Sequence, residues 1–302
     1  MIEKFFVKKS ANELEKLSNQ EIQEILKNLP FRLENFYKEI LFFIDTIEKD
    51  KNIDKNILYR NLKTLVIKKD DFLLKGQTLA YYKVSSNQIV LSEKYHPNEF
   101  FHELLHMASS IYSTCEHTNF CGISQRSLKK RINIGSSLNE GYTELLCERY
   151  FPNYFSTSYC EEKNIAWAVE EIIGVESMYK YYFNADLYGL INSLLQFTDE
   201  SSILLFLTSS VKNNENKSIK NFLKQIYIKQ LQNNLSNGDI NTEDFVNKIA
   251  LFFYRLGYRK VDNECKKLIN DELKEQIVKQ YNKIRINQQN QSMKLVFDMY
   301  HK

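Results

Sequence analysis

Apolar residues recur with helical spacing at both ends of the chain, and with strand-like spacing only in a short stretch between them. In residues 10–29, Leu and Ile lie three and four positions apart, after a Ser10 that Glu13 follows at the spacing of a capping box. We expect Pro30 to end this helix. Residues 31–49 repeat the pattern, so the two segments predict a helical hairpin.

The spacing of apolar residues becomes strand-like between residues 63 and 94. KTLVIKK (63–69) is short and rich in β-branched residues, and QTLAYYKV (77–84) and QIVLSEK (88–94) flank the turn-forming SSN (85–87). These segments predict a small sheet with at least one hairpin. His96 and Pro97 then offer the start of a helix over about residues 98–113, because proline is tolerated in the first turn.

Helical spacing returns after a polar segment. Residues 114–137 contain Gly122 and Gly135 and are expected to form a long loop with at most a short helix inside. A second central helix is expected over residues 138–151. Further helical blocks follow, with polar connections between them, at 161–183, 185–197, 200–211, 217–235, 242–256, 262–285 and 290–300.

These patterns predict an α+β protein that is predominantly helical, with its small sheet at about residues 63–94. Gly (8) and Pro (3) are scarce, which favours helices because helix interiors tolerate neither residue. We expect an N-terminal helical segment (1–60), a core with the sheet and the two central helices (61–155) and a C-terminal helical region (156–302). No clear linker separates them, so one continuous domain stays open.

Charge and cysteine content narrow the class of function. The 41 basic and 38 acidic residues nearly balance and form no long basic block, so nucleic-acid or anionic-membrane binding has no compositional support. The five cysteines are odd in number and scattered, which favours reduced thiols over a disulfide framework. No secretory signal or membrane-spanning segment is evident, so a cytoplasmic location is expected, with leaderless export left open.

Two of the five histidines lie in the segment FFHELLHMASS (100–110). Residues four apart share one face of an α-helix, so His102 and His106 can direct both imidazoles at one ion. Glu103 lies about 100° further round the helix, where its carboxylate can take a proton from a metal-bound water. This is the physical content of the zinc motif H-E-x-x-H.

The motif alone can be accidental, since histidine pairs also occur on ordinary helices. The surrounding residues are apolar, however, and two imidazoles and a carboxylate at that depth need partners, which one metal ion supplies. A third ligand must come from elsewhere. The metzincin pattern needs a third His and a Gly where this chain has Tyr112 and Ser109, and the deformylase pattern needs a Cys upstream of His102, where there is none.

The segment LNEGYTELL (138–146) resembles the N-E-x-x-[ST]-[DE] pattern of the gluzincins, the thermolysin-like superfamily. The resemblance covers roughly residues 64–150, and the paired motifs are similar to those of peptidase-like proteins of low-GC bacteria. It implies Glu140 as the third zinc ligand, with Glu144 accepting the other ring N–H of His102 and Asn139 beside the substrate backbone. Glu144 stands where the family usually has Asp. The family's active-site helix packs against a small zincin-like sheet whose edge strand pairs with the extended substrate.

The resemblance also implies a Tyr, His or Arg that stabilises the oxyanion of the reaction. Tyr182 is our candidate, and Tyr188 is an equal rival. Tyr142 lies between the two acidic residues but points about 200° away from Glu140 on the helix. Gly141 either permits a close approach of two helices or is a tolerated mid-helix glycine.

The segment CEHTNFC (115–121) carries Cys115, His117 and Cys121, but a second zinc site needs a fourth ligand that is not evident, so an ordinary loop with free thiols is favoured. His96 is expected to cap a helix or lie at the surface, and His301 to be solvated.

Together the motifs predict a zinc metallopeptidase, a hydrolase that binds one Zn²⁺ ion and acts on a peptide or protein substrate. The alternative is a non-catalytic metal-binding regulatory or interaction module with a peptidase-like fold. A more distant alternative is a structural protein with a chance motif. A fourth protein ligand would favour the structural alternative, because catalytic zinc sites keep one position open. The oligomeric state stays open.

Overall fold

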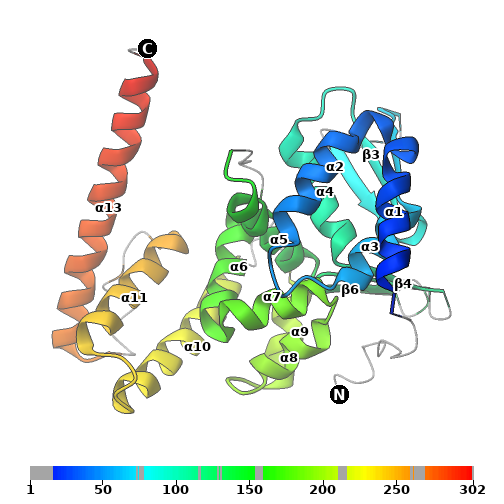
Figure 1. Ribbon diagram of the computed structural model, residues 1–302. Helices are drawn as coiled ribbons and strands as arrows, with labels where there is room; N and C mark the ends of the chain where they lie inside the picture. Colours follow the sequence, from blue (N-terminus) through cyan, green and yellow to red (C-terminus); the bar gives the residue numbers. More distant parts are fainter. Residues whose placement is uncertain are drawn as a thin grey trace. The chain divides into compact units, whose positions relative to one another are not determined.

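The fold is described from a computed structural model (Figure 1). The structure describes residues 16–72, 74, 78–114, 117–127, 129, 131–153, 159–209, 216–258, 261 and 269–300, with side chains up to residue 291. It is mixed α and β and predominantly helical, as the sequence predicts. The chain forms two compact units, Met1–Asn216 and Lys217–Lys302, so the boundaries expected near residues 60 and 155 lie inside the first unit.

Three helices and one short 3-10 turn open the described part of the first unit: α1 (Asn19–Arg32), η3 (Glu34–Phe36), α2 (Tyr37–Ile47) and α3 (Lys55–Thr64). Ser10 lies outside the described residues, and residues 16–18 are not helical, so the helix expected from residue 10 does not run unbroken. Instead Ser18 caps α1, forming a reciprocal capping box with Glu21. Pro30 does not end the helix, because in the last turn a proline removes only one hydrogen bond.

The expected small sheet is present. Its strands β1 (Val66–Lys69), β2 (Ala80–Lys83) and β3 (Gln88–Leu91) lie in the order β1-β3-β2. The β2–β3 hairpin is antiparallel and turns through η4 (Val84–Ser86) and Asn87, whose φ of 45° is left-handed. β1 pairs parallel with β3, whose residues are mostly buried. β2 is therefore an edge strand, and it packs against the next helix, α4.

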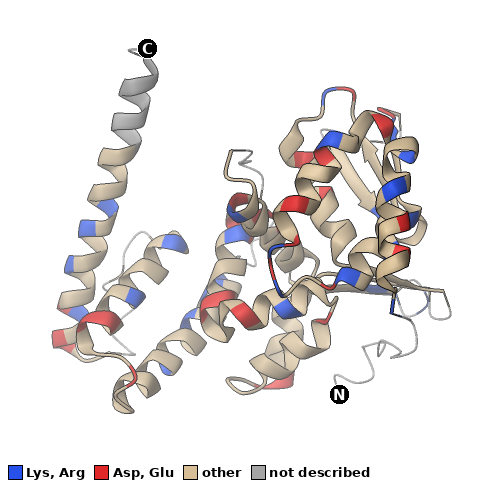
Figure 2. Cartoon of the chain, viewed as in Figure 1, with Lys and Arg blue, Asp and Glu red and all other residues tan. Residues whose placement is uncertain are grey.

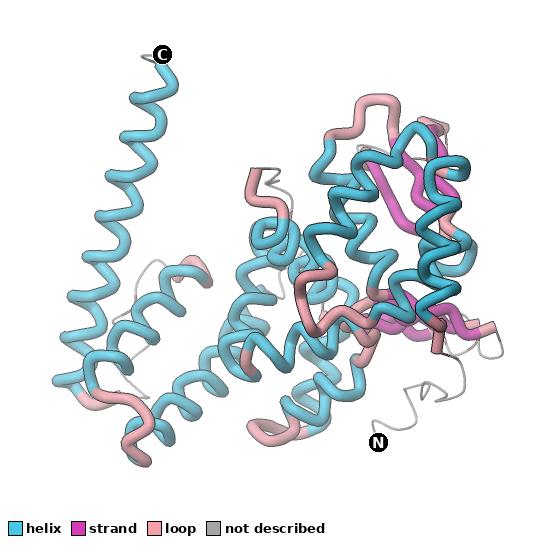
Figure 3. The backbone as a smooth tube through the Cα atoms, in the orientation of Figure 1, coloured by secondary structure: helices cyan, strands magenta, loops and turns pink. Residues whose placement is uncertain are grey.

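The helix α4 (Pro97–Ala108) starts as expected, with Pro97 in its first turn, but it is shorter than expected. The segment expected to continue it is β4 (Ser110–Ser113), the first strand of an antiparallel sheet completed by β5 (Thr118–Cys121), β6 (Ser124–Ser127) and β7 (Ile132–Ile134), in the order β4-β5-β6-β7 (Figure 3). The expectation of a loop over 114–137 was wrong. These strands are three or four residues long and bury polar side chains such as Gln125 and Ser127, so hydrophobic spacing does not reveal them.

Five helices complete the described part of the first unit: α5 (Ser136–Tyr150), α6 (Cys160–Ile173), α7 (Val175–Phe183), α8 (Leu187–Leu194) and α9 (Glu200–Thr208). α5 packs against α4 on one side and α6 on another. A Cβ on Gly141 would lie 2.1 Å from the Glu162 carbonyl oxygen, so this glycine allows the close approach of α5 to α6. The block expected over 161–183 divides at Gly174, whose φ is 91°.

The second unit contains α10 (Asn216–Ser236), α11 (Thr242–Arg255) and α13 (Asp271–Tyr300). Its core includes Tyr227 stacked on Phe252, with ring centroids 4.3 Å apart. Residues 271–300 form one helix, so the break expected between 285 and 290 is wrong. Basic and acidic residues are interspersed over both units (Figure 2). None of the helices in the described part of the chain is long and apolar enough to cross a membrane.

Candidate metal centre

Three side chains from two packed helices converge on one point. His102 and His106 lie one turn apart on α4, and Glu140 comes from α5, which packs against α4. His102 Nε2 lies 3.1 Å from Glu140 Oε2 and 3.1 Å from His106 Nε2, and His106 Nε2 lies 3.3 Å from Glu140 Oε2. The three atoms thus form a nearly equilateral triangle.

The size of this triangle fits a tetrahedral zinc ion. Ligand atoms at zinc's usual bond lengths and at tetrahedral angles lie about 3.3 Å apart. Two imidazole nitrogens and a carboxylate oxygen are also a donor set that zinc takes in catalytic sites. Over the ranges that the structure describes, this is the one group of three or more His, Cys, Asp or Glu residues arranged to share an ion.

A second carboxylate orients His102. Its Nδ1 lies 3.2 Å from Oε2 of the buried Glu144, one turn after Glu140 on α5. With Nδ1–H donating to Glu144, Nε2 keeps its lone pair for an ion. The contact expected from the motif is therefore present despite the longer side chain of Glu.

His106 is held by a group of weaker contacts on its Nδ1 side. Asn139 Nδ2 lies 3.3 Å away, Cys121 Sγ 3.4 Å and Thr143 Oγ1 3.5 Å. The Asn139 side chain is fixed in turn, because its Oδ1 accepts the Ile123 N–H at 3.0 Å. Asn139 thus braces a histidine ring at the pocket wall and is itself buried.

The electrostatics of the cluster favour a positive charge between its members. Burial alone would lower the pKa of His102, but contacts with Cys147, Glu140 and Glu144 raise this pKa well above its usual value. The pKa of His106 is likewise raised against the effect of burial, chiefly by Glu140. Burial would raise the pKa of Glu140, but the two histidines hold it well below its usual range. A proton or a metal ion satisfies all three groups.

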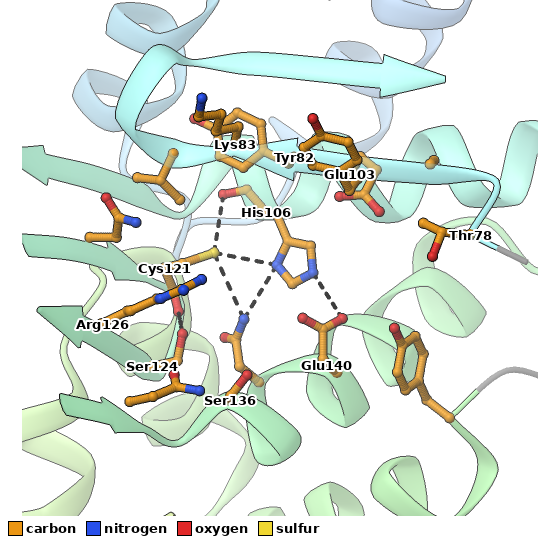
Figure 4. Close-up of a pocket in the computed structure, with 17 residues that line it drawn as sticks. Thr78, Tyr82, Lys83, Glu103, His106, Cys121, Ser124, Arg126, Ser136 and Glu140 are labelled. Atoms are coloured by element: carbon orange, nitrogen blue, oxygen red, sulfur yellow. Dashed lines mark hydrogen bonds and ion pairs between the residues drawn. The ribbon is translucent and has the colours of Figure 1, made fainter. Parts of the chain in front are cut away.

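Glu103 stands beside the cluster in a pocket of about 400 Å³. Figure 4 shows its carboxylate under β2, with His106 and Glu140 facing each other below it. The side chain is 8 % exposed, and burial raises the pKa of its carboxyl, while His102 and His106 lower it. A carboxylate next to the open side of a metal site is the arrangement that a general base needs.

The candidate oxyanion residue Tyr182 lies behind the site. It is fully buried, its hydroxyl is 2.7 Å from Thr143 Oγ1, and it does not line the pocket. Tyr188 is 38 % exposed on α8 and does not line the pocket either. Tyr142 faces away, with its hydroxyl donating to Glu170 at 2.7 Å. This placement gives Tyr182 a supporting position against Thr143 and no surface for a substrate.

A tyrosine that the sequence does not single out does line the pocket. Tyr159 lies just before α6, and its ring stacks on His102 with centroids 5.7 Å apart. Its φ of 54° is unusual for a residue with a side chain. Burial, with a contribution from Glu140, raises the pKa of Tyr159 to about 12, so its hydroxyl keeps its proton at neutral pH. Tyr81 and Tyr82 reach the same pocket from β2.

The other candidate ligands do not join the triangle. Cys121 contacts His106 on the Nδ1 side, away from the Nε2 that faces Glu140. His117 is exposed, with its Nδ1 3.4 Å from the Tyr112 hydroxyl. His96 caps α4, while Cys115 and His301 lie outside the described residues. Within the described part of the chain, three protein side chains are therefore arranged to share an ion.

Comparison of the chain with protein-family models, curated proteins and solved structures gives no match. A function is therefore inferred from the two motifs and from the geometry that brings them together.

Proposed function

We propose that this protein is a zinc-dependent metallopeptidase of the gluzincin type. The observation that carries the proposal is the triangle of His102, His106 and Glu140 at the side of a pocket that also exposes Glu103. A bound zinc ion would acidify its water and polarise the carbonyl of a peptide bond. The cytoplasmic location expected from the sequence stays a prediction.

The residues around the cluster have distinct roles in this proposal. Glu103 takes a proton from the attacking water and returns it to the leaving amine. Tyr159 donates its hydroxyl proton in a hydrogen bond to the oxyanion that forms on the carbonyl. Glu144 and Asn139 touch no reacting atom and hold the two imidazoles in place.

The pocket also supports an extended peptide as the substrate. Residues 80–83 line it from the edge strand β2, which pairs only with β3 among the described strands. An edge strand binds a peptide by main-chain hydrogen bonds, as in a sheet. The β1–β3 sheet would then take the place of the zincin-like sheet implied by the resemblance.

A non-catalytic metal site is the competing explanation. Structural zinc sites are closed by four protein ligands, whereas the residues that the structure describes offer three candidates. A structural site also has no use for a buried carboxylate beside its ligands. Glu103 thus favours hydrolysis over a regulatory or structural role.

The test compares Glu103→Gln with the parent protein. We expect the variant to bind zinc at the parent stoichiometry, measured by metal analysis, and to lose hydrolysis of a pool of short synthetic peptides. Glu93→Gln is a matched control, since Glu93 is exposed and lies outside the pocket. Hydrolysis by Glu103→Gln at the parent rate would refute the mechanism, and an absence of bound zinc in the parent would refute the metal site.

A further inference from the structure

The second sheet places a polar row across one end of the pocket. Asn119 on β5 lies directly opposite Arg126 on β6, and Arg126 lies opposite Asn133 on β7. Directly paired residues point to the same face of a sheet. All three line the pocket that contains Glu103 and His106, so this face is turned toward the metal centre.

Arg126 is placed to receive an anion. Its side chain is exposed, and in the part of the chain that the structure describes no carboxylate forms an ion pair with it. Figure 4 shows its side chain directed toward the space between the two sheets. Of the pocket's own carboxylates, Glu140 belongs to the candidate metal cluster, and Glu103 stands beside that cluster. Guanidinium groups match carboxylates with two parallel hydrogen bonds, and the flanking asparagine amides offer further donors.

The fold fixes which end of the pocket this row occupies. β2 runs from Ala80 to Lys83 and continues into η4, and η4 contacts β4 and β5. The second sheet therefore lies at the Lys83 end of β2. Lys83 itself lines that end, which adds a second positive charge.

The position of this polar row determines on which side of the cleaved bond it contacts the substrate. A peptide that pairs antiparallel with β2, the slightly more stable mode, runs from the Lys83 end toward the Ala80 end. Residues near Arg126 are then N-terminal to the bond at the metal. Cys121 contacts His106, and Asn119 lies two positions earlier on β5, or about 7 Å along the strand. A peptide that continues from β2 alongside β5 advances about 3.3 Å per residue. In that pose, the row faces a side chain about two residues before the bond.

We propose that Arg126, flanked by Asn119 and Asn133, selects peptides with an Asp or Glu about two residues on the N-terminal side of the cleaved bond. This inference rests on the proposed peptidase function and adds a substrate class to it. Arg126 is a specificity residue here and takes no part in the chemistry.

The experiment uses pools of short synthetic peptides in which one position is fixed as Glu, Gln or Lys and the others vary. Cleavage sites are read by mass spectrometry, so the fixed residue is placed relative to each cut. We expect the parent to cleave the Glu pool about 10-fold faster than the Gln pool when the fixed residue precedes the cut, as for one charged hydrogen-bonded pair. Arg126→Gln should lose this ratio and keep its rate on the Gln pool, and Arg126→Glu should favour the Lys pool.

Arg131→Gln is the matched control. Arg131 is an exposed cation of the same sheet, in the connection between β6 and β7, and it does not line the pocket. Its substitution should leave the Glu-to-Gln ratio unchanged. Equal cleavage of both pools by the parent, or a preference only for residues after the cut, would overturn the proposal while leaving the peptidase function intact.

A binding experiment distinguishes failure of this inference from failure of the proposed peptidase function. Fluorescently labelled peptides from both pools are titrated into the zinc-loaded Glu103→Gln variant, with and without Arg126→Gln. A preference for the Glu peptides that needs Arg126, together with no cleavage by the parent, would keep the acidic subsite and refute hydrolysis. An equal affinity for both, or no binding of either, would refute the subsite.

Discussion

His102 Nδ1 lies 3.2 Å from Glu144 Oε2, so the carboxylate one turn beyond Glu140 holds the ring of His102. Glu144 is 4 % exposed and approaches His102 from the side opposite the metal-facing nitrogen. This contact links α4 and α5 directly behind the candidate metal centre. It makes the geometry of the centre depend on a residue that binds no metal.

Replacing Glu144 should therefore weaken zinc binding without removing a ligand. We expect Glu144→Ala to lower zinc affinity by about 10-fold to 100-fold, the usual effect of losing such a partner. Competition with a chromophoric chelator measures this affinity. Glu148→Ala is the control, because Glu148 lies on the same helix in an exposed pair with Lys163. An unchanged affinity in Glu144→Ala would show that the contact does not orient His102.

Removal of the side-chain hydroxyl should have different effects at Tyr159 and at Tyr182. Tyr159→Phe should keep its zinc and lower kcat by about 100-fold, because it removes a donor to the oxyanion. Tyr182→Phe removes a buried hydrogen bond to Thr143 and should cost about 1 kcal/mol of stability with a much smaller effect on kcat. Steady-state kinetics and thermal unfolding of both variants distinguish the two roles. A large kcat loss in Tyr182→Phe alone would restore the assignment expected from the sequence.

The sequence alone could select the three residues of the triangle, because their spacing is local to two helices. The i, i+4 spacing of His102 and His106 needs only helical geometry, and Glu140 follows from a motif on a second helix whose apolar residues also show helical spacing. The same apolar spacing continues past residue 108, so it predicts helix for Ser110–Ser113, which forms β4 instead. The end of the helix at Ser109 depends on the pairing of β4 with β5, which the apolar spacing of residues 98–113 does not encode.

The rest of the pocket depends on contacts that no local pattern encodes. The chain has 19 tyrosines, and only the path of the backbone brings Tyr159 rather than Tyr182 to the pocket. Arg126 lies in a polar segment that lacks the apolar alternation of a half-buried strand. Its neighbours Asn119 and Asn133 come from other strands, so the row exists only once the register is known.

Zinc should stabilise the folded first unit. A ligand that binds only the folded state adds about 2.7 kcal/mol when present at 100 times its Kd. We expect chelator-treated protein to unfold at a lower temperature than zinc-loaded protein, with recovery on adding zinc. His102→Ala and His106→Ala should unfold at the same temperature with and without zinc. A zinc-dependent shift that persists in both variants would place the ion elsewhere.

Gly141 couples the packing of α5 against α6 to the candidate metal centre, because it directly follows Glu140 and faces α6. A Cβ at this position would meet the Glu162 backbone, with the carbonyl oxygen 2.1 Å away, and backbone cannot give way as a flexible side chain can. Gly141→Ala should therefore push α5 from α6 and cost about 1–3 kcal/mol of stability.

Because α5 carries Glu140 and Glu144, the displacement caused by Gly141→Ala should also reduce zinc affinity. Gly174→Ala provides the contrast: its Cβ would meet nothing within 4 Å, but its φ of 91° disfavours a side chain. That variant should lose stability and keep the parent affinity for zinc. Thermal unfolding and chelator competition on both variants separate strain in the backbone from displacement of a ligand helix. Parent-like zinc affinity in Gly141→Ala would mean that α4 and α5 hold the metal centre independently of α6.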